Sequence, residues 1–172
     1  MKQPRRAVVI SALGITQIFS WGSSYYLLAV LAKPIAADTG WSLSLIIGGL
    51  SLGLLAGGLV SPRVGRTIDA YGGRSVLAAS SLLIGCGQLV LASAYHPATY
   101  VVAWLIMGMG MGAGLYDAAF ATLGRAYGKD ARSAITTLTL WGGFASTVCW
   151  PISAFLVDAA GWRFACLAYG AL

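Results

Sequence analysis

The sequence contains no glutamate and few charged residues of any kind. Its 172 residues include five acidic and eleven basic side chains, so that 9% of the chain is charged, whereas about one-quarter of a typical soluble domain is charged. So few charges cannot give a soluble domain of this size a water-compatible surface. Hydrophobic residues make up 58% of the chain, and the mean hydropathy is +0.79. The composition therefore predicts an integral membrane protein whose apolar surface faces lipid.

Side chains that usually carry catalysis or hold metals are also scarce. The one histidine lies in a predicted loop, and Cys86, Cys149 and Cys166 lie inside apolar runs without metal-ligand spacing. No Ser–His pair, aspartate pair or metal-ligand set falls within the apolar runs. The sequence therefore predicts no enzyme, no cofactor and no metal. The net charge of +6 does not indicate nucleic-acid binding, because the basic residues are dispersed in short clusters between apolar runs.

Long runs with few or no charges predict transmembrane helices. They span residues 7–32, 42–62, 75–95, 100–124, 133–157 and 164–172. Each of the first five is long enough to cross about 30 Å of hydrocarbon at about 1.5 Å per residue, whereas the last is predicted to be an incomplete span. Pro34 is expected to end the first helix, and Ser42 or Ser44 to cap the second. The predicted fold is an all-α membrane bundle that forms one domain, residues 1–172.

Basic residues gather in alternate connections between these runs. Nine of the eleven lie in the N-terminal segment, the second-to-third connection and the fourth-to-fifth connection, whereas the other side holds only Lys33 and Arg163. The nine are Lys2, Arg5, Arg6, Arg63, Arg66, Arg74, Arg125, Lys129 and Arg132. Because basic residues accumulate on the cytoplasmic side of membrane proteins, the N-terminus is predicted to be cytoplasmic.

The second-to-third connection carries the most specific motif in the sequence, the segment Gly65–Arg74. Its skeleton is G-x-x-x-D-x-x-G-x-R, formed by Gly65, Asp69, Gly72 and Arg74. Gly72 is expected to adopt a positive φ in a tight reversal, because glycine has no Cβ atom to oppose it. Gly65 is expected to let its helix approach a neighbour closely. The Asp69 carboxylate is expected to pair with the surrounding arginines.

This motif resembles the signature loop of the major facilitator superfamily, which lies between the same two helices. The resemblance implies the six-helix N-terminal bundle of a transporter, with the sixth helix truncated and the C-terminal half absent. It also implies ion- or proton-coupled transport of a small solute by alternating access. In the family this loop latches the cytoplasmic gate shut. The residues that would form the latch here are Gly65, Arg66, Asp69, Gly72 and Arg74, with Arg125 as a further partner. The alternative is that these charges only orient the loop.

The resemblance also implies partners and a location. The partners are a small-molecule substrate, the lipid bilayer, and either the C-terminal half of the same transporter or a second copy of this chain. An alternative function is a half-size membrane subunit or remnant that does not transport alone. The expected location is the inner membrane of a bacterium. The segments Gly161-Trp162-Arg163 and Gly40-Trp41-Ser42 resemble bacterial members near the monocarboxylate-porter branch.

Alternating glycines in the fourth run predict close helix packing. They are Gly108, Gly110, Gly112 and Gly114, and they resemble the glycine-rich fourth helix of the family. Small residues at such positions let the backbones of membrane helices approach closely.

Asp117 is the only ionisable residue deep in a predicted span. A buried charge in a membrane is costly, so Asp117 is expected to face a cavity or a partner and to serve as a proton carrier or substrate contact. Gln17, Trp21 and Tyr25 share one helical face, which the resemblance places at the central cavity together with Tyr116. The alternative for these residues is interhelical packing and hydrogen bonding.

Overall fold

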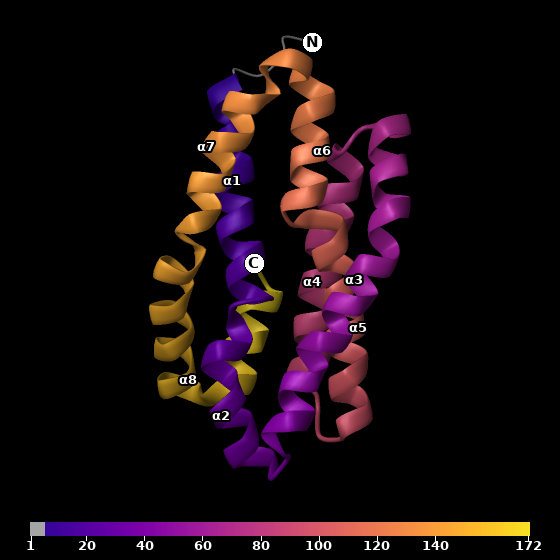
Figure 1. Cartoon of the computed structure of the whole chain (residues 1–172). Helices are drawn as coiled ribbons and strands as arrows, with labels where there is room; N and C mark the ends of the chain where they lie inside the picture. The colour runs from indigo at the N-terminus through magenta and orange to yellow at the C-terminus, as the bar shows by residue number, and fades with distance from the viewer. Residues whose placement is uncertain (1–5) are drawn as a thin grey trace.

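The computed structural model describes residues 6–172, and within that range every regular element is a helix (Figure 1). The helices are α1 (Arg6–Ser23), α2 (Leu27–Thr39), α3 (Leu43–Tyr71), α4 (Arg74–Ala92), α5 (Pro97–Gly114), α6 (Tyr116–Tyr127), the 3-10 turn η1 (Gly128–Asp130), α7 (Ala131–Gly143) and α8 (Ala145–Gly170). The predicted all-α class is confirmed. Lys2 and Arg5, which entered the charge argument, lie outside the described residues.

Four joined helical segments are long and apolar enough to cross a membrane. They are Arg6–Thr39, Leu43–Tyr71, Arg74–Ala92 and Pro97–Gly170. The last segment is long enough to hold several passes, and its chain reverses direction at η1 and again at Gly161, whose φ is 84° (Figure 1). The helices therefore run back and forth along one bundle axis.

The connections divide between the two ends of the bundle. The α3–α4 connection, η1 and the start of α1 lie at one end, which we call the basic end (Figure 1). The α2–α3 and α4–α5 connections and the turn at Gly161 lie at the opposite end (Figure 1). Most of the arginines in the described connections are therefore at the basic end, as the alternation of charge in the sequence predicts.

The boundaries of α2 and α3 test two sequence predictions. Pro34 was expected to end the first helix, and this expectation is wrong, because α2 continues through Pro34 and ends at Gly40 with φ 71°. Membrane helices tolerate an internal proline where surrounding groups compensate for the missing N–H. The prediction of a cap at Ser42 is confirmed, since the Ser42 side chain accepts a hydrogen bond from the Leu45 backbone N–H at 3.3 Å.

Three of the predicted apolar runs are interrupted within the bundle. The first is broken between α1 and α2, where Tyr26 N–H donates to the Trp21 carbonyl, a wider turn than an α-helix makes. Leu115 separates α5 from α6 with an extended backbone of ψ −162°. Phe144 separates α7 from α8. Absence of charge in a run thus indicates membrane burial without revealing where the helix is broken.

The four alternating glycines of α5 face two different neighbours. A Cβ atom at Gly108 would lie 2.5 Å from the Gly53 Cα atom of α3, and one at Gly112 would lie 2.8 Å from the Gly57 Cα atom. By contrast, Gly110 and Gly114 lie against α4, where added Cβ atoms would meet the side chains of Ile84 and Ser80. Glycines at every second position therefore let α5 pack closely between α3 and α4.

Substitution of Gly108 tests this packing. We expect Gly108→Ala to lower the free energy of unfolding by about 1–3 kcal/mol, because the added methyl group meets backbone atoms that cannot rotate away. Gly48→Ala is the matched control, since a Cβ atom there meets nothing within 4 Å. Reversible unfolding of the purified protein in mixed micelles would measure both. Equal stabilities for the two variants would contradict the proposed close packing of α3 and α5.

Candidate functional site

A groove in the middle of the bundle contains the one acidic residue that was expected inside a span. We call it the Asp117 groove. Its volume is about 590 Å³, and it is open rather than enclosed. It is lined by Trp21, Leu54, Gly57, Gly58, Ser61, Pro62, Met111, Gly112, Leu115, Tyr116 and Asp117. The groove therefore lies between α3, the α5–α6 break and one aromatic side chain of α1.

The break at Leu115 places Asp117 on this groove. Asp117 is the second residue of α6, and its side chain is exposed. The first N–H groups of a helix have no partner within it and form its positive end, which favours a carboxylate. Within residues 6–172 the ion pair found is Arg163–Asp38, so no described basic side chain pairs with Asp117. Asp117 thus presents a carboxyl group to an open, mostly apolar groove.

Trp21 lies at the centre of an aromatic cluster beside Asp117. Its ring centroid is 5.0 Å from that of Tyr116, 5.5 Å from Tyr25 and 5.9 Å from Tyr26. Tyr116 also stacks on Phe120 with 5.1 Å between centroids and 12° between planes. Trp21 and Tyr116 line the groove, whereas the half-exposed Tyr25 does not. Two of the aromatic residues expected at the cavity are therefore brought to Asp117, and Tyr25 supports them from one side.

Gln17 lies behind the groove instead of lining it. Its side chain is 1% exposed. The Gln17 Nε2 group donates to the Gly114 carbonyl at 2.7 Å, and Gln17 Oε1 accepts from Trp21 Nε1 at 3.1 Å. Gly114 is the last residue of α5, next to the break. The side-chain amide of Gln17 therefore holds both the Trp21 ring and the backbone segment that leads to Asp117. Gln17 thus acts as a positioning residue.

A second buried glutamine, which was not predicted from the sequence, has the same role at another helix break. Gln88 of α4 is fully buried, and its Nε2 group donates to the Ser23 carbonyl at the end of α1. A lone amide in the apolar run 75–95 was the available signal, because a polar group in such a run needs a buried partner. Gln17 and Gln88 thus each satisfy a carbonyl beside a break.

The structure corrects two expectations about the loop between α3 and α4, the segment Gly65–Arg74. Asp69 was expected to pair with an arginine, but its side chain is exposed and no described ion pair includes it. Gly65 was expected to permit a close approach, but open space surrounds it, whereas a Cβ atom at Gly73 would lie 2.6 Å from the Thr122 Cβ atom. Tight packing in this loop therefore falls at Gly73, while Asp69 stays accessible.

Arg125 links this loop to α6 through the backbone. Its guanidinium donates to the Ile68 carbonyl at 3.1 Å and to the Ala70 carbonyl at 3.3 Å. These carbonyls flank Asp69 in the last turn of α3, where a cation is favourable. Gly72 ends the helix with φ 90°, the positive value that the motif predicts. Arg125 therefore fixes the backbone around Asp69 without neutralising its carboxylate.

Arg163 joins three connections at the opposite end of the bundle. Its guanidinium pairs with Asp38 of α2, donates to the Ala94 carbonyl at 3.2 Å and lies 4.5 Å from the Tyr95 ring centroid. Trp162 Nε1 also donates to Asp38 at 3.1 Å. The sequence did not predict this cluster, because its members are far apart in the chain.

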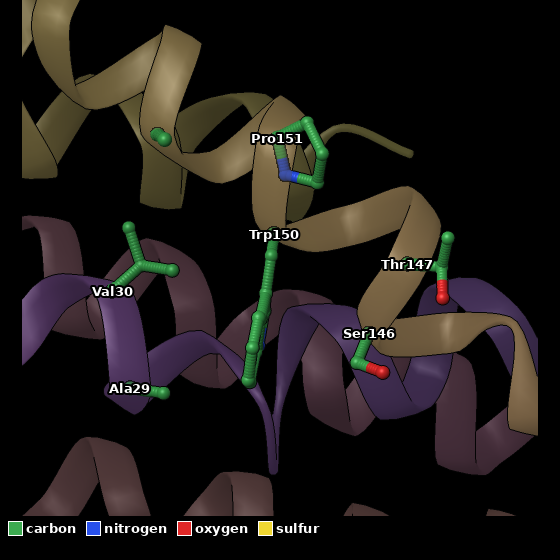
Figure 2. A pocket seen from close by; sticks show the side chains of 7 residues that line it. Ala29, Val30, Ser146, Thr147, Trp150 and Pro151 are labelled. Carbon is green, nitrogen blue, oxygen red and sulfur yellow. The ribbon is translucent and has the colours of Figure 1, made fainter.

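A second hollow lies between α2 and α8 (Figure 2). Its volume is about 450 Å³, and its lining is mainly apolar. Figure 2 shows the Trp150 ring extending from α8 toward α2, beside Val30. No charged side chain lines this hollow, so it offers nothing with which to bind or release a proton. Of these two hollows, the Asp117 groove is therefore the candidate site.

Comparison with known protein families gives a match. The family model described as Major Facilitator Superfamily matches residues 13–172, which is most of the sequence. No curated protein sequence matches the chain.

Substitution of Gln17 tests its role behind the groove. We expect Gln17→Leu to lower the free energy of unfolding by about 1–3 kcal/mol, because the Gly114 carbonyl and the Trp21 N–H both lose a buried partner. The near-ultraviolet circular dichroism of the Trp21 ring should change as well. The control is Thr16→Val, since the exposed Thr16 hydroxyl bonds only the Ala12 carbonyl within its own helix. Unchanged stability and spectrum in Gln17→Leu would exclude the positioning role.

Proposed function

The chain belongs to the major facilitator superfamily of membrane transporters, and we propose that it moves a small solute by alternating access at the Asp117 groove. The observation that carries this proposal is the groove itself. It brings the one acidic residue of the fourth predicted span together with two aromatic side chains at a helix break. Transporters of this kind bind substrate near the bilayer midplane, at discontinuous helices.

The open side of the groove requires a second wall. Because the groove is open, a solute held there would remain exposed on one side. We propose that the other wall is the C-terminal half of the same transporter or a second copy of this chain. Substrate would then lie between the two halves, which is where alternating-access transporters place it.

The loop around Asp69 is proposed to control access from the cytoplasm. Arg125 fixes the last turn of α3, and Asp69 lies exposed on it. An exposed carboxylate on a fixed backbone can bind the positive end of a helix in the opposing half when the gate closes and can leave it when the gate opens. The excess of basic residues at this end supports a cytoplasmic N-terminus, and a bacterial inner membrane is the proposed location.

Asp117 is proposed to couple transport to protons. It is an ionisable group in the middle of the bundle without a described basic partner. Its carboxyl group can therefore take up a proton on one side of the membrane and release it on the other as access alternates.

Cysteine accessibility tests alternating access without knowledge of the substrate. Gly58 lines the groove, and a Cβ atom there would meet nothing within 4 Å. In a Cys86→Ser background, Gly58→Cys should react with sulfonatoethyl methanethiosulfonate in both right-side-out and inside-out vesicles. Adding Asp69→Asn should raise labelling from the cytoplasmic side by about threefold or more, because a stabilising contact of the closed gate is lost. Asp130→Asn, the same change in the η1 turn, is the control.

The same assay can contradict the proposal in two ways. Labelling of Gly58→Cys from one side only would exclude alternating access at this groove. Equal labelling with and without Asp69→Asn would exclude the gate.

Substitution of Asp117 tests proton coupling. Once a transported solute has been identified by uptake screening, we expect Asp117→Asn to remove the dependence of uptake on an imposed pH gradient, because an amide cannot take up and release the proton. Solute exchange at equal, saturating concentrations should persist, since access to the groove still alternates. Uptake by Asp117→Asn that still responds to the pH gradient would rule out Asp117 as the proton carrier.

A further inference from the structure

We propose that the Asp117 groove binds an organic cation, an ammonium compound with apolar substituents. This inference rests on the proposed function, because it names the substrate class of the same site. Three features carry it: one negative side chain, aromatic rings held in place beside that side chain, and a lining without basic residues.

The fixed charge in the groove is negative. Asp117 is the one charged residue among the eleven that line it. The N-terminus of α6 adds about half a positive elementary charge beside Asp117, which leaves the ionised site negative overall. Arg125 lies on the same helix but donates to carbonyls at the end of α3. An anionic solute would therefore meet the carboxylate without a described basic side chain in the lining to offset it.

The aromatic side chains suit a cation. The faces of Trp and Tyr rings attract a cation that lies within about 6 Å of the ring centroid. Trp21 and Tyr116 both line the groove, with centroids 5.0 Å apart and planes 50° apart. Gln17 holds the Trp21 N–H, and the Thr139 carbonyl accepts from the Tyr116 hydroxyl at 3.3 Å. Both rings are thus fixed through their polar atoms. Phe120 covers one face of Tyr116, so a ligand would meet the parts of the two rings that line the groove.

The rest of the lining favours an organic cation over a metal ion. A bare Ca²⁺ takes about six to eight oxygen ligands and Mg²⁺ about six, whereas the side-chain oxygens in the lining belong only to Ser61, Tyr116 and Asp117. Leu54, Met111 and Leu115 offer apolar surface for alkyl or aryl substituents. A volume of about 590 Å³ also lies within the range of about 300–1,000 Å³ that is usual for small-molecule sites.

Two ligands of similar shape and opposite charge test the substrate class. We expect benzyltrimethylammonium to bind the purified protein in detergent, measured by isothermal titration calorimetry, and phenylmethanesulfonate to bind at least about tenfold more weakly. Asp117→Asn should weaken binding of the cation by about tenfold. Asp158→Asn, the same change in the exposed segment before Gly161, should leave it unaltered.

Two substitutions at Trp21 separate the contribution of the aromatic ring face to cation binding from that of the indole N–H. Trp21→Phe and Trp21→Leu both remove the hydrogen bond to Gln17, but only phenylalanine keeps an aromatic face. We expect Trp21→Phe to bind benzyltrimethylammonium about threefold or more tightly than Trp21→Leu does. Equal binding by these two variants would overturn the role of the ring.

The outcomes separate this inference from the proposed function. If the unaltered protein binds phenylmethanesulfonate as tightly as benzyltrimethylammonium, the proposal of a cationic substrate is overturned. This comparison does not depend on the folding of any variant. Absence of ammonium binding in a protein whose Gly58→Cys variant still labels from both sides also overturns this proposal and leaves alternating access standing. Loss of two-sided labelling would instead count against the proposed function itself.

Discussion

The structure depends on one constraint of the membrane interior, namely that a backbone carbonyl released from a helix must find another partner. Lipid supplies none, and each unsatisfied group costs several kcal/mol. The bundle has interruptions beside Ser23 and Gly114, and a buried glutamine from a neighbouring helix donates to each of these carbonyls. At both interruptions, a glutamine side chain therefore satisfies a carbonyl beside the helix break. The interruption after Gly114 also makes the candidate site possible, because an unbroken helix would have no N-terminus at Asp117.

The same support links the break to the shape of the groove. The Gln17 Nε2 group donates to the Gly114 carbonyl, and Gln17 Oε1 accepts from the Trp21 indole N–H. A movement of α5 relative to α1 must therefore stretch the first bond or carry the indole with it. Close packing of α5 against α3 through Gly108 and Gly112 restricts such a movement further. The groove, the break and the packing of three helices are in this way mechanically linked, which is consistent with the proposed substrate site keeping its shape as the bundle moves.

The sequence predicted what depends on composition and local pattern. The all-α membrane class, the alternation of basic connections, the cap at Ser42 and the positive φ of Gly72 follow from charge, hydropathy and the lack of a Cβ atom, and each can be read locally. The breaks at Tyr26, Leu115 and Phe144 could not be read in this way. They depend on partners far along the chain, such as Gln88 for Ser23. Two local readings also failed, since α2 continues through Pro34 and open space surrounds Gly65.

The two ends of the bundle differ in how their charges are used, and this difference bears on motion. Opposite the basic end, Arg163 binds Asp38, the Ala94 carbonyl and the Tyr95 ring, so three connections are tied together within this chain. At the basic end, Arg125 binds backbone carbonyls and leaves the Asp69 carboxylate exposed. A charged side chain that is paired within the bundle stabilises the bundle as one rigid body. A charged side chain without such a partner can form a contact in one conformational state and lose it in another. The asymmetry therefore agrees with the proposal that this bundle moves as a unit and makes reversible contacts at the Asp69 end.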